Sequence, residues 1–324
     1  TSDCHPQTIS LIQTRAEPLN ITVEIVAPEC TADVDNAFGV LAQYPGTLGD
    51  VRDLSQAISS CHEKNILFGV ATALLALTVL KPPGAMGADV VLGSSQRFGV
   101  PMGYGGPHAA FFATREEFKR SLPGRVIGVS IDSKGRQALR MAMQTREQHI
   151  RREKATSNIC TAQALLAIMA GLYAMHHGPD GLRAIGERVH AMTSSLAASL
   201  RGGGFTVLND TWFDTLCIEV DDAPAVLQRA ADNGYNCRII NASCLGISLD
   251  ETTTSTDLAT LANIFGVQPV NGVSGIPETL LRQVDYLSHP LFQDYRTETE
   301  MLRYLKRLEN KDISLTRSMI PLGS

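Results

Sequence analysis

The chain lacks the cysteine patterns that mark a metal site or a disulfide framework. Its 324 residues include seven cysteines, and none of them forms a Cys-x-x-Cys pair or a Cys/His cluster with zinc-ligand spacing. We therefore expect reduced thiols in a reducing compartment, with a buried structural role for each rather than a catalytic one. The cysteines are Cys4, Cys30, Cys61, Cys160, Cys217, Cys237 and Cys244.

A long apolar run and an excess of positive charge are also lacking. The most apolar stretch, Cys160–Met175, is too short and too rich in alanine for a membrane span, and it predicts a buried helix. The net charge of −5 and a pI near 5.9 argue against a nucleic-acid partner, because phosphate neutralisation needs a basic face. The chain starts at Thr1 without an initiator Met or a signal pattern, so we expect a fragment.

The first half of the chain alternates strand-like and helix-like segments. This alternation predicts an α/β fold, with a mainly parallel sheet and helices on its faces. We expect strands at Ile21–Val26, Phe38–Gln43, Ile66–Ala71, Ala88–Leu92 and Ala109–Ala113, and helices at Asp50–Glu63 and Leu74–Leu80.

The second half predicts a long helix followed by a smaller unit. A polar, charge-dense segment at Arg136–Lys154 precedes the buried helix, and Pro179–Arg201 forms an amphipathic helix that ends at three glycines. A βαββα pattern over 214–265 suits a small α+β domain, and Glu298–Glu309 predicts a final helix. We expect a large domain over 1–178, a connecting helix over 179–204, a small domain over 205–270, and a loop with a C-terminal helix over 271–324.

Three stretches carry a resemblance that covers essentially the whole chain. They are Leu92–His108, Gln144–Thr161 and Glu309–Leu315, and shorter matches occur at Asp3–Thr8 and Leu245–Glu251. These residues resemble the P-protein family of the glycine cleavage system. The resemblance implies a duplicated aminotransferase-like fold (fold type I) that depends on pyridoxal 5′-phosphate (PLP). Each half would carry a large α/β domain and a smaller C-terminal domain, and this chain resembles most of the N-terminal half.

The resemblance also implies where the cofactor chemistry would lie. A PLP enzyme of this fold needs a lysine for the Schiff base and a carboxylate that keeps the pyridine nitrogen protonated. Alignment of the two halves of the family places Gln96 at the lysine position and Val70 near the carboxylate position. Gln96 cannot form an imine and Val70 cannot pair with a pyridinium. We therefore expect this half to be catalytically silent by itself, with PLP bound to a lysine outside this chain.

The glycine-rich loop Gly99–His108 is the main candidate for a functional surface, because glycines allow close approach of the backbone. One interpretation is that it borders the active-site channel across the interface between halves, and the other is a packing relic of the duplicated site. A basic cluster around residues 146–154 either contacts the partner half or an acidic carrier protein, or is simply solvated and ion-paired. The candidate interface residues are Gln96, Arg97, Tyr104, His108, Arg146 and His149.

The parent enzyme implied by the resemblance decarboxylates glycine and transfers the aminomethyl group to the lipoyl arm of the H-protein. Its other expected partner is the C-terminal half or subunit, in a dimer of such units, in the mitochondrial matrix of a eukaryote or the cytoplasm of a bacterium. Two alternatives stay open: a free-standing binding or regulatory module, and a divergent PLP enzyme that uses Lys81 or Lys154. The family usually has acids where this chain has Ala73 and Ala85, which predicts altered ion pairing there.

Some isolated residues have simpler interpretations. His62 is expected to make local hydrogen bonds, and His176 and His177 to end a helix, where a cation favours the dipole. Trp212 and Phe213 are expected to be core anchors rather than a cofactor platform.

Overall fold

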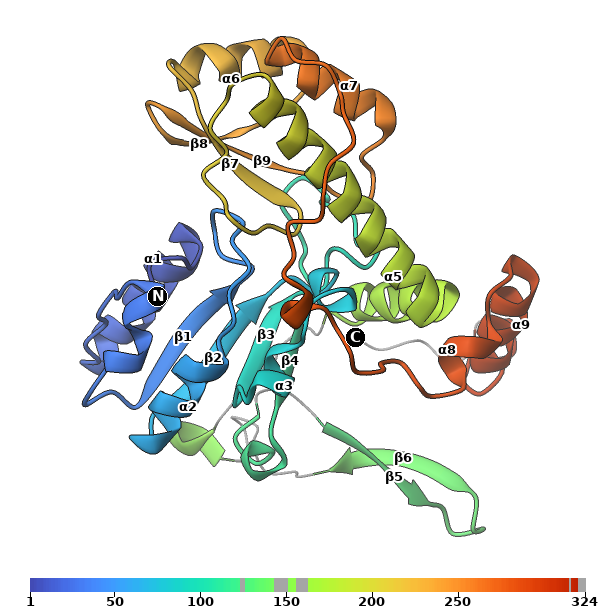
Figure 1. Ribbon diagram of the computed structural model, residues 1–324. Coiled ribbons are helices and arrows are strands. Elements are labelled where there is room, and N and C mark those ends of the chain that lie inside the picture. Colours follow the sequence, from blue (N-terminus) through green and yellow to red (C-terminus); the bar gives the residue numbers. More distant parts are fainter. Residues whose placement is uncertain (123–125, 143–150, 156–162, 315, 320–324) are drawn as a thin grey trace.

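The structure is a computed structural model that describes residues 1–122, 126–142, 151–155, 163–314 and 316–319. Within these ranges the strands form a four-stranded sheet, a three-stranded sheet and a two-stranded hairpin. Figure 1 shows the three-stranded sheet above the four-stranded one, with the long helix α5 descending beside both and the hairpin standing apart below.

The four-stranded sheet has the order β1-β2-β3-β4. Its first three strands are parallel, and β4 runs antiparallel to β3, so the expected mainly parallel α/β sheet is confirmed. Phe68 and Val70 in the middle of β2 are completely buried, as expected for a strand that is covered on its faces. The strands are β1 (Gly39–Tyr44), β2 (Leu67–Thr72), β3 (Val90–Ser94) and β4 (Ala110–Thr114).

The connections between the parallel strands differ from the expected helices in one place. Helix α2 (Ser55–Glu63) joins β1 to β2 and buries Ile58 and Cys61; it ends where predicted but begins five residues later than the expected Asp50. The predicted helix Leu74–Leu80 is wrong, because only the single 3₁₀ turn η3 (Ala76–Thr78) forms there. Seven residues before a Pro-Pro pair are too few to repay helix nucleation. The turn leads into the short α3 (Pro83–Met86).

The predicted strand Ile21–Val26 is also wrong. Residues 21–27 contain neither helix nor strand and follow helix α1 (Pro6–Ala16) and the 3₁₀ turn η1 (Glu17–Leu19). Side chains such as Ile25 remain exposed in this segment. Apolar β-branched residues form a strand only where a neighbouring strand accepts their backbone hydrogen bonds, and none lies there among the described residues. A further 3₁₀ segment, η2 (Pro28–Asp33), leads into β1.

Helix α5 (Ala164–Gly202) connects the two sheets and is bent at Gly178, whose φ of 58° and ψ of −173° are not helical. Pro179 follows directly. Arg296 holds the bend, because its Nη1 donates to the carbonyl of His177, and its guanidinium occupies the space that a side chain at position 178 would need. Tyr286 Oη also donates to Pro179 O at 2.6 Å. His176 and His177 thus end the first part of the helix, as expected.

The three-stranded sheet has the antiparallel order β7-β9-β8, and the predicted βαββα pattern is confirmed. Its helices begin at side-chain caps: Asp222 accepts from Ala225 N, and Thr254 forms a capping box with Asp257. The elements are β7 (Thr215–Glu219), α6 (Ala223–Asp232), β8 (Arg238–Asn241), β9 (Cys244–Ser248) and α7 (Ser255–Ile264).

The hairpin of β5 (Val126–Ile131) and β6 (Gln137–Ala142) was not predicted. β6 falls within the segment expected to be merely polar and charged, and η5 (Arg152–Lys154) follows it after a gap in the described residues. The hairpin is preceded by the 3₁₀ turn η4 (Glu116–Phe118). Apolar residues alternate in β5 at Ile127, Val129 and Ile131, but Val126 is apolar as well and Gly128 is a poor strand former, and both weaken the pattern.

The C-terminal segment passes back along α5 before it leaves the body of the molecule. It contains the 3₁₀ turn η6 (Glu278–Leu280), the short α8 (Leu291–Asp294) and α9 (Glu298–Glu309), the last with the predicted bounds. No helix in the described part of the chain combines the length and the apolar character that crossing a membrane requires.

Candidate functional site

The parallel strands β1, β2 and β3 all end at one edge of the four-stranded sheet, where ligands of open α/β sheets usually bind. Three buried hydroxyls lie at or just beyond these strand ends, on Tyr44, Thr72 and Ser95. None has a hydrogen-bond partner within the described residues. Burial, and then the nearby charge of Asp53, raise the pKa of Tyr44, so its hydroxyl stays protonated.

The residues at this edge do not fit a Schiff-base cofactor. Gln96 lies two residues after β3, half-buried, and its backbone N donates to Ser94 Oγ at 3.1 Å. No lysine is buried in the described ranges, and Val70 is enclosed within β2 with no exposed surface. Among the described residues, moreover, no group of His, Cys, Asp or Glu side chains has the arrangement of a metal site.

The buried carboxylate of Asp89 is used by the fold. It accepts from Phe68 N at 2.7 Å, and His62 Nε2 lies 2.8 Å from the same oxygen. Arg115 Nη1 lies 3.3 Å from its other oxygen. The expected local hydrogen bonding of His62 is confirmed. Asp89 precedes β3, at the end of the strand away from the candidate edge, so it is not available to a pyridinium there.

Arg97 joins the two sheets through paired carboxylates. Its Nη1 donates to Asp214 and its Nε to Glu251, both at 2.7 Å, and all three side chains are largely buried. Burial alone would lower the pKa of Arg97, but the two carboxylates raise it above its ordinary value. Its Nη2 is buried without a partner in the part of the chain that the structure describes. Arg97 therefore positions the start of the glycine-rich loop against the smaller sheet.

The glycine-rich loop has an anchored start and an exposed tip. Gly99 has a φ of +72°, and a side chain there would clash with the ring of Tyr173 on α5. The ring of Phe98 lies 5.9 Å from the same tyrosine. Farther along, Tyr104 has a φ of +57° and is fully exposed, as is most of the His108 side chain. The loop thus has a start that is packed on α5 and a tip that faces solvent.

The structure brings together only part of the predicted set of interface residues. Gln96 and Arg97 lie at the loop's anchored start, and Tyr104 and His108 lie at its exposed end. Arg146 and His149 fall outside the described residues. The rest of the predicted basic cluster lies in and next to η5.

The other positions singled out from the sequence are not part of a reactive centre. Lys81 is half-buried, and its Nζ donates to Ser55 Oγ at 3.4 Å, whereas Lys154 is exposed. Neither lysine is buried in the manner of a Schiff-base residue. Ala73 directly follows β2 and is half-buried, and Ala85 is exposed on α3.

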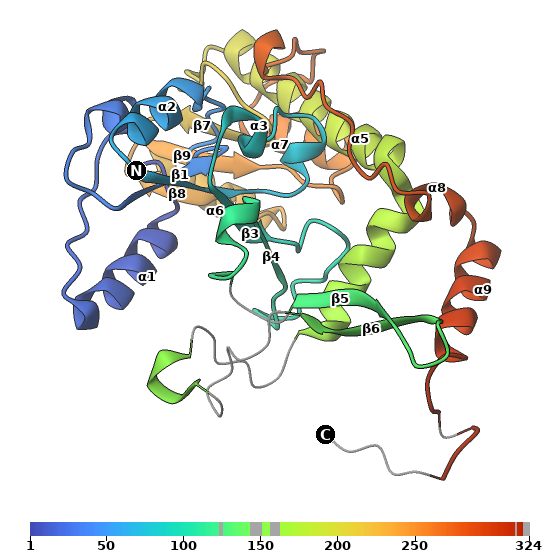
Figure 2. The ribbon, with the colours of Figure 1, turned by 90° about the horizontal axis from the view of Figure 1, so that it is seen from below.

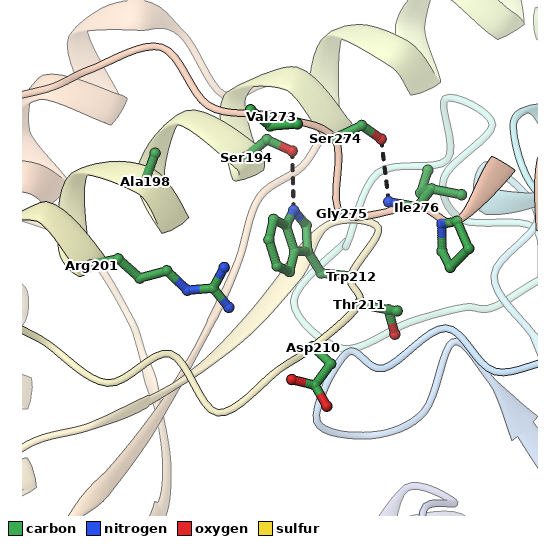
Figure 3. Close-up of a pocket in the computed structure, with 11 residues that line it drawn as sticks. Ser194, Ala198, Arg201, Asp210, Thr211, Trp212, Val273, Ser274, Gly275 and Ile276 are labelled. Atoms are coloured by element: carbon green, nitrogen blue, oxygen red, sulfur yellow. Dashed lines mark hydrogen bonds between the residues drawn. The ribbon is translucent and has the colours of Figure 1, made fainter.

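A pocket that the sequence did not indicate lies beside α5 (Figure 3), with a volume of about 460 Å³. Trp212 forms its floor and donates from Nε1 to Ser194 Oγ at 3.0 Å. The Arg201 guanidinium lies 5.0 Å from the centre of the indole ring, and Asp210 lies below the ring in the view of Figure 3. Both Trp212 and Phe213 are buried, which confirms them as core anchors. Three segments far apart in sequence build this pocket, so no local motif reveals it.

His190, on α5, contacts the same three segments. Its Nδ1 lies 2.9 Å from the Phe213 carbonyl oxygen, and its Nε2 lies 2.8 Å from Ser274 Oγ. Burial lowers the pKa of His190, more than the carbonyl and Asp214 raise it, so the neutral ring is favoured. With both ring nitrogens partnered, His190 serves the packing of the 270s segment on α5.

Comparisons with known proteins agree with this geometry. The family model of the glycine cleavage system P-protein matches residues 1–265. Glycine dehydrogenase (decarboxylating) of Thermosynechococcus vestitus is 56% identical over 327 residues, which cover 99% of this chain and 34% of the relative. The enzyme of the same name from Jannaschia sp. is 56% identical over 324 residues, with the same coverage. The chain thus spans about a third of the length of these relatives.

Solved structures give the same result for the fold. A glycine decarboxylase (P-protein) of the glycine cleavage system, crystallised in inhibitor-bound form, matches with a TM-score of 0.74 and 31% identity over 81% of this chain and 63% of that chain. Aspartate aminotransferase from Thermus thermophilus matches with a TM-score of 0.51 and 18% identity over 77% of this chain and 71% of that chain. The second match shows the fold alone, which is that of the fold type I enzymes.

Proposed function

The chain belongs to the glycine cleavage system P-protein family, and on that basis we propose that the full-length protein is a PLP-dependent glycine dehydrogenase (decarboxylating). Its reaction would be the decarboxylation of glycine, with transfer of the aminomethyl group to the lipoyl arm of an H-protein. The support is the family match over residues 1–265 and the 56% identity to enzymes of that name. Because the chain spans about a third of those enzymes, the activity is assigned to the whole protein.

Within that protein, this chain is the part that does not hold the cofactor. Gln96 carries this proposal, because its amide side chain stands where the resemblance places the Schiff-base lysine, and an amide forms no imine. The absence of any buried lysine from the described residues supports it. The buried carboxylates Asp89 and Asp214 are both taken by protein donors, so neither is free to pair with a pyridinium.

The chain would instead complete the active-site wall across an interface. Arg97 fixes the start of the glycine-rich loop on the smaller sheet, and the loop presents Tyr104 and His108 to solvent. Polar groups on an exposed loop with an anchored start suit contact with another part of the enzyme. The full proposed interface set is Gln96, Arg97, Tyr104, His108, Arg146 and His149.

The remaining proposals concern partners and place. A lipoylated H-protein, the catalytic remainder of the enzyme and a dimeric assembly follow from the proposed reaction. The relatives described above are bacterial, which supports a cytoplasmic location.

Glycine decarboxylation tests the proposed function. The full-length protein is incubated with carboxyl-labelled glycine, PLP and lipoylated H-protein, beside the 324-residue chain at equal concentration. We expect release of labelled carbon dioxide from the full-length protein only. Release by the 324-residue chain alone would contradict the assignment of catalysis to the rest of the enzyme, and no release by the full-length protein would contradict the activity itself.

A further inference from the structure

The β5–β6 hairpin has one face made almost entirely of exposed apolar side chains. The register pairs Ile127 with Met141, Val129 with Leu139, and Ile131 with Gln137, so these six residues share one face. Val129, Ile131 and Leu139 are 70%, 73% and 71% exposed. Figure 1 shows the hairpin below both larger sheets, and Figure 2, seen from below, shows it in front of the lower end of α5. A contiguous apolar face of this kind marks an interaction surface.

The hairpin is preformed at its turn. Asp132 Oδ1 accepts from Lys134 N at 2.8 Å and from Arg136 N at 2.9 Å, and the next glycine, Gly135, has a φ of +76°. The opposite face carries smaller, half-buried side chains such as Ser130 and Ala138. The large apolar side chains of the hairpin are therefore gathered on one face.

We propose that this apolar face is a docking surface for the part of the full-length protein that lies outside this chain. The chain spans about a third of its relatives' length, so a large surface of the same protein remains to be accommodated. A two-stranded hairpin is marginal by itself in water, and burial of one face against another part of the protein supplies the missing stability. The inference rests on the proposed function only in that the chain works within a longer protein.

A second exposed apolar stripe supports an interface on this side of the molecule. Helix α9 has no buried residue, and Leu302, Leu305 and Leu308 on it are exposed. These three recur at the spacing of one helix face. In Figure 1, α9 and the outer end of the hairpin both lie on the right-hand side.

Charge around the hairpin disfavours a second copy as the occupant. Lys134 and Arg136 are exposed in the turn that ends the apolar strip, and the nearby carboxylate, Asp132, is bound to Arg136 at 2.9 Å. Two stacked copies would bring like charges together. The surface that complements this face of the hairpin would be apolar at its centre and acidic at its rim.

A photo-crosslink identifies the occupant. The full-length protein is prepared with benzoylphenylalanine in place of Val129, irradiated and digested, and the crosslinked peptides are identified by mass spectrometry. We expect crosslinks to residues outside the 324-residue chain, well above those from the same group at exposed Val270. Crosslinks to the body of this chain, to a second copy of it, or no crosslink above the Val270 level would each overturn the proposal.

Hydrogen exchange gives a second, independent readout on the full-length protein. The pair Val129→Asp and Leu139→Asp should speed amide exchange across 126–142 by about tenfold, whereas Val270→Asp should leave it unchanged. Fast exchange of this hairpin already in the unaltered protein would overturn the proposal. Neither readout depends on PLP or on decarboxylation. These experiments can therefore overturn the docking proposal without affecting the proposed function, and a failed decarboxylation assay leaves the docking proposal untouched.

Discussion

Arg97 shows how one residue can serve both the fold and the proposed interface. Its guanidinium joins the glycine-rich loop to carboxylates that lie 117 and 154 residues farther along the chain. Loss of the guanidinium would leave Asp214 buried and without its cation, which is the costly outcome for a buried pair. We therefore expect Arg97→Met to lower the free energy of unfolding by about 2–3 kcal/mol, measured by urea unfolding, since the pair is not fully buried.

Arg136→Met is the matched control for this prediction. Arg136 also binds a carboxylate at 2.9 Å, but its side chain is 71% exposed, and such pairs contribute about 0–1 kcal/mol. If both variants lost the same free energy of unfolding, the Arg97 ion pairs would contribute no more than an exposed surface pair. That result would contradict their role in joining the two sheets.

His190 gives the chain a predictable response to acid. Because burial lowers its pKa in the folded state, its contribution to stability is present above the unfolded value near 6.5 and is lost as the pH falls below it. We expect the unfolding temperature to fall on going from pH 7.5 to 5.5, and to fall less in His190→Gln. Burial also lowers the pKa values of His5 and His177, so some acid sensitivity should persist in the variant. An identical decrease in both proteins would contradict this role for His190.

At the scale of elements, the segment after α7 depends on a close approach to α5. A side-chain carbon at Gly272 would lie 1.9 Å from the Ser194 carbonyl oxygen, a backbone atom that cannot move aside cheaply. We expect Gly272→Ala to lower the free energy of unfolding by about 2–3 kcal/mol. Gly171→Ala on α5 meets no atom within 4 Å and should instead stabilise by about 0.5–1 kcal/mol. Urea unfolding of both variants measures the contrast, and the same sign for both would refute it.

The elements that were predicted correctly carry their own signals. Strands such as Leu67–Thr72 are short apolar runs between turn residues, and α9 has a clear helical period with capping residues at Thr297 and Glu300. The two wrong assignments, Ile21–Val26 and Leu74–Leu80, have the right composition, but one lacks a partner strand and the other lacks length. The composition of a segment shows neither whether a partner strand lies beside it nor whether it is long enough to form a helix.

The hairpin was missed for the opposite reason. Ile127, Val129 and Ile131 alternate along β5, but the charged residues from Arg136 onward gave its second strand a polar composition. Apolar side chains that alternate along a strand normally lie against another surface. Their exposure in this chain indicates that the surface that covers them lies outside it. The docking proposal explains why such residues occur there.

At the scale of the whole molecule, the sequence was informative about the family. The placement of Gln96 at the Schiff-base position stays a prediction that rests on the resemblance, and its consequence is chemical, because an amide forms no imine. The partners of Arg97 and the pocket at Trp212 could not be predicted from the sequence, because both arise from contacts between distant segments. Residues that meet only through such long-range contacts form no short sequence motif, so the sequence does not reveal them.

The site of cofactor attachment tests the central claim most directly. The full-length protein is loaded with PLP, reduced with borohydride to fix the imine, and digested for peptide mapping by mass spectrometry. We expect the reduced PLP–lysine adduct on a peptide outside the 324 residues, with Lys81 and Lys154 unmodified. An adduct on either of these lysines, or on any other lysine of this chain, would contradict it.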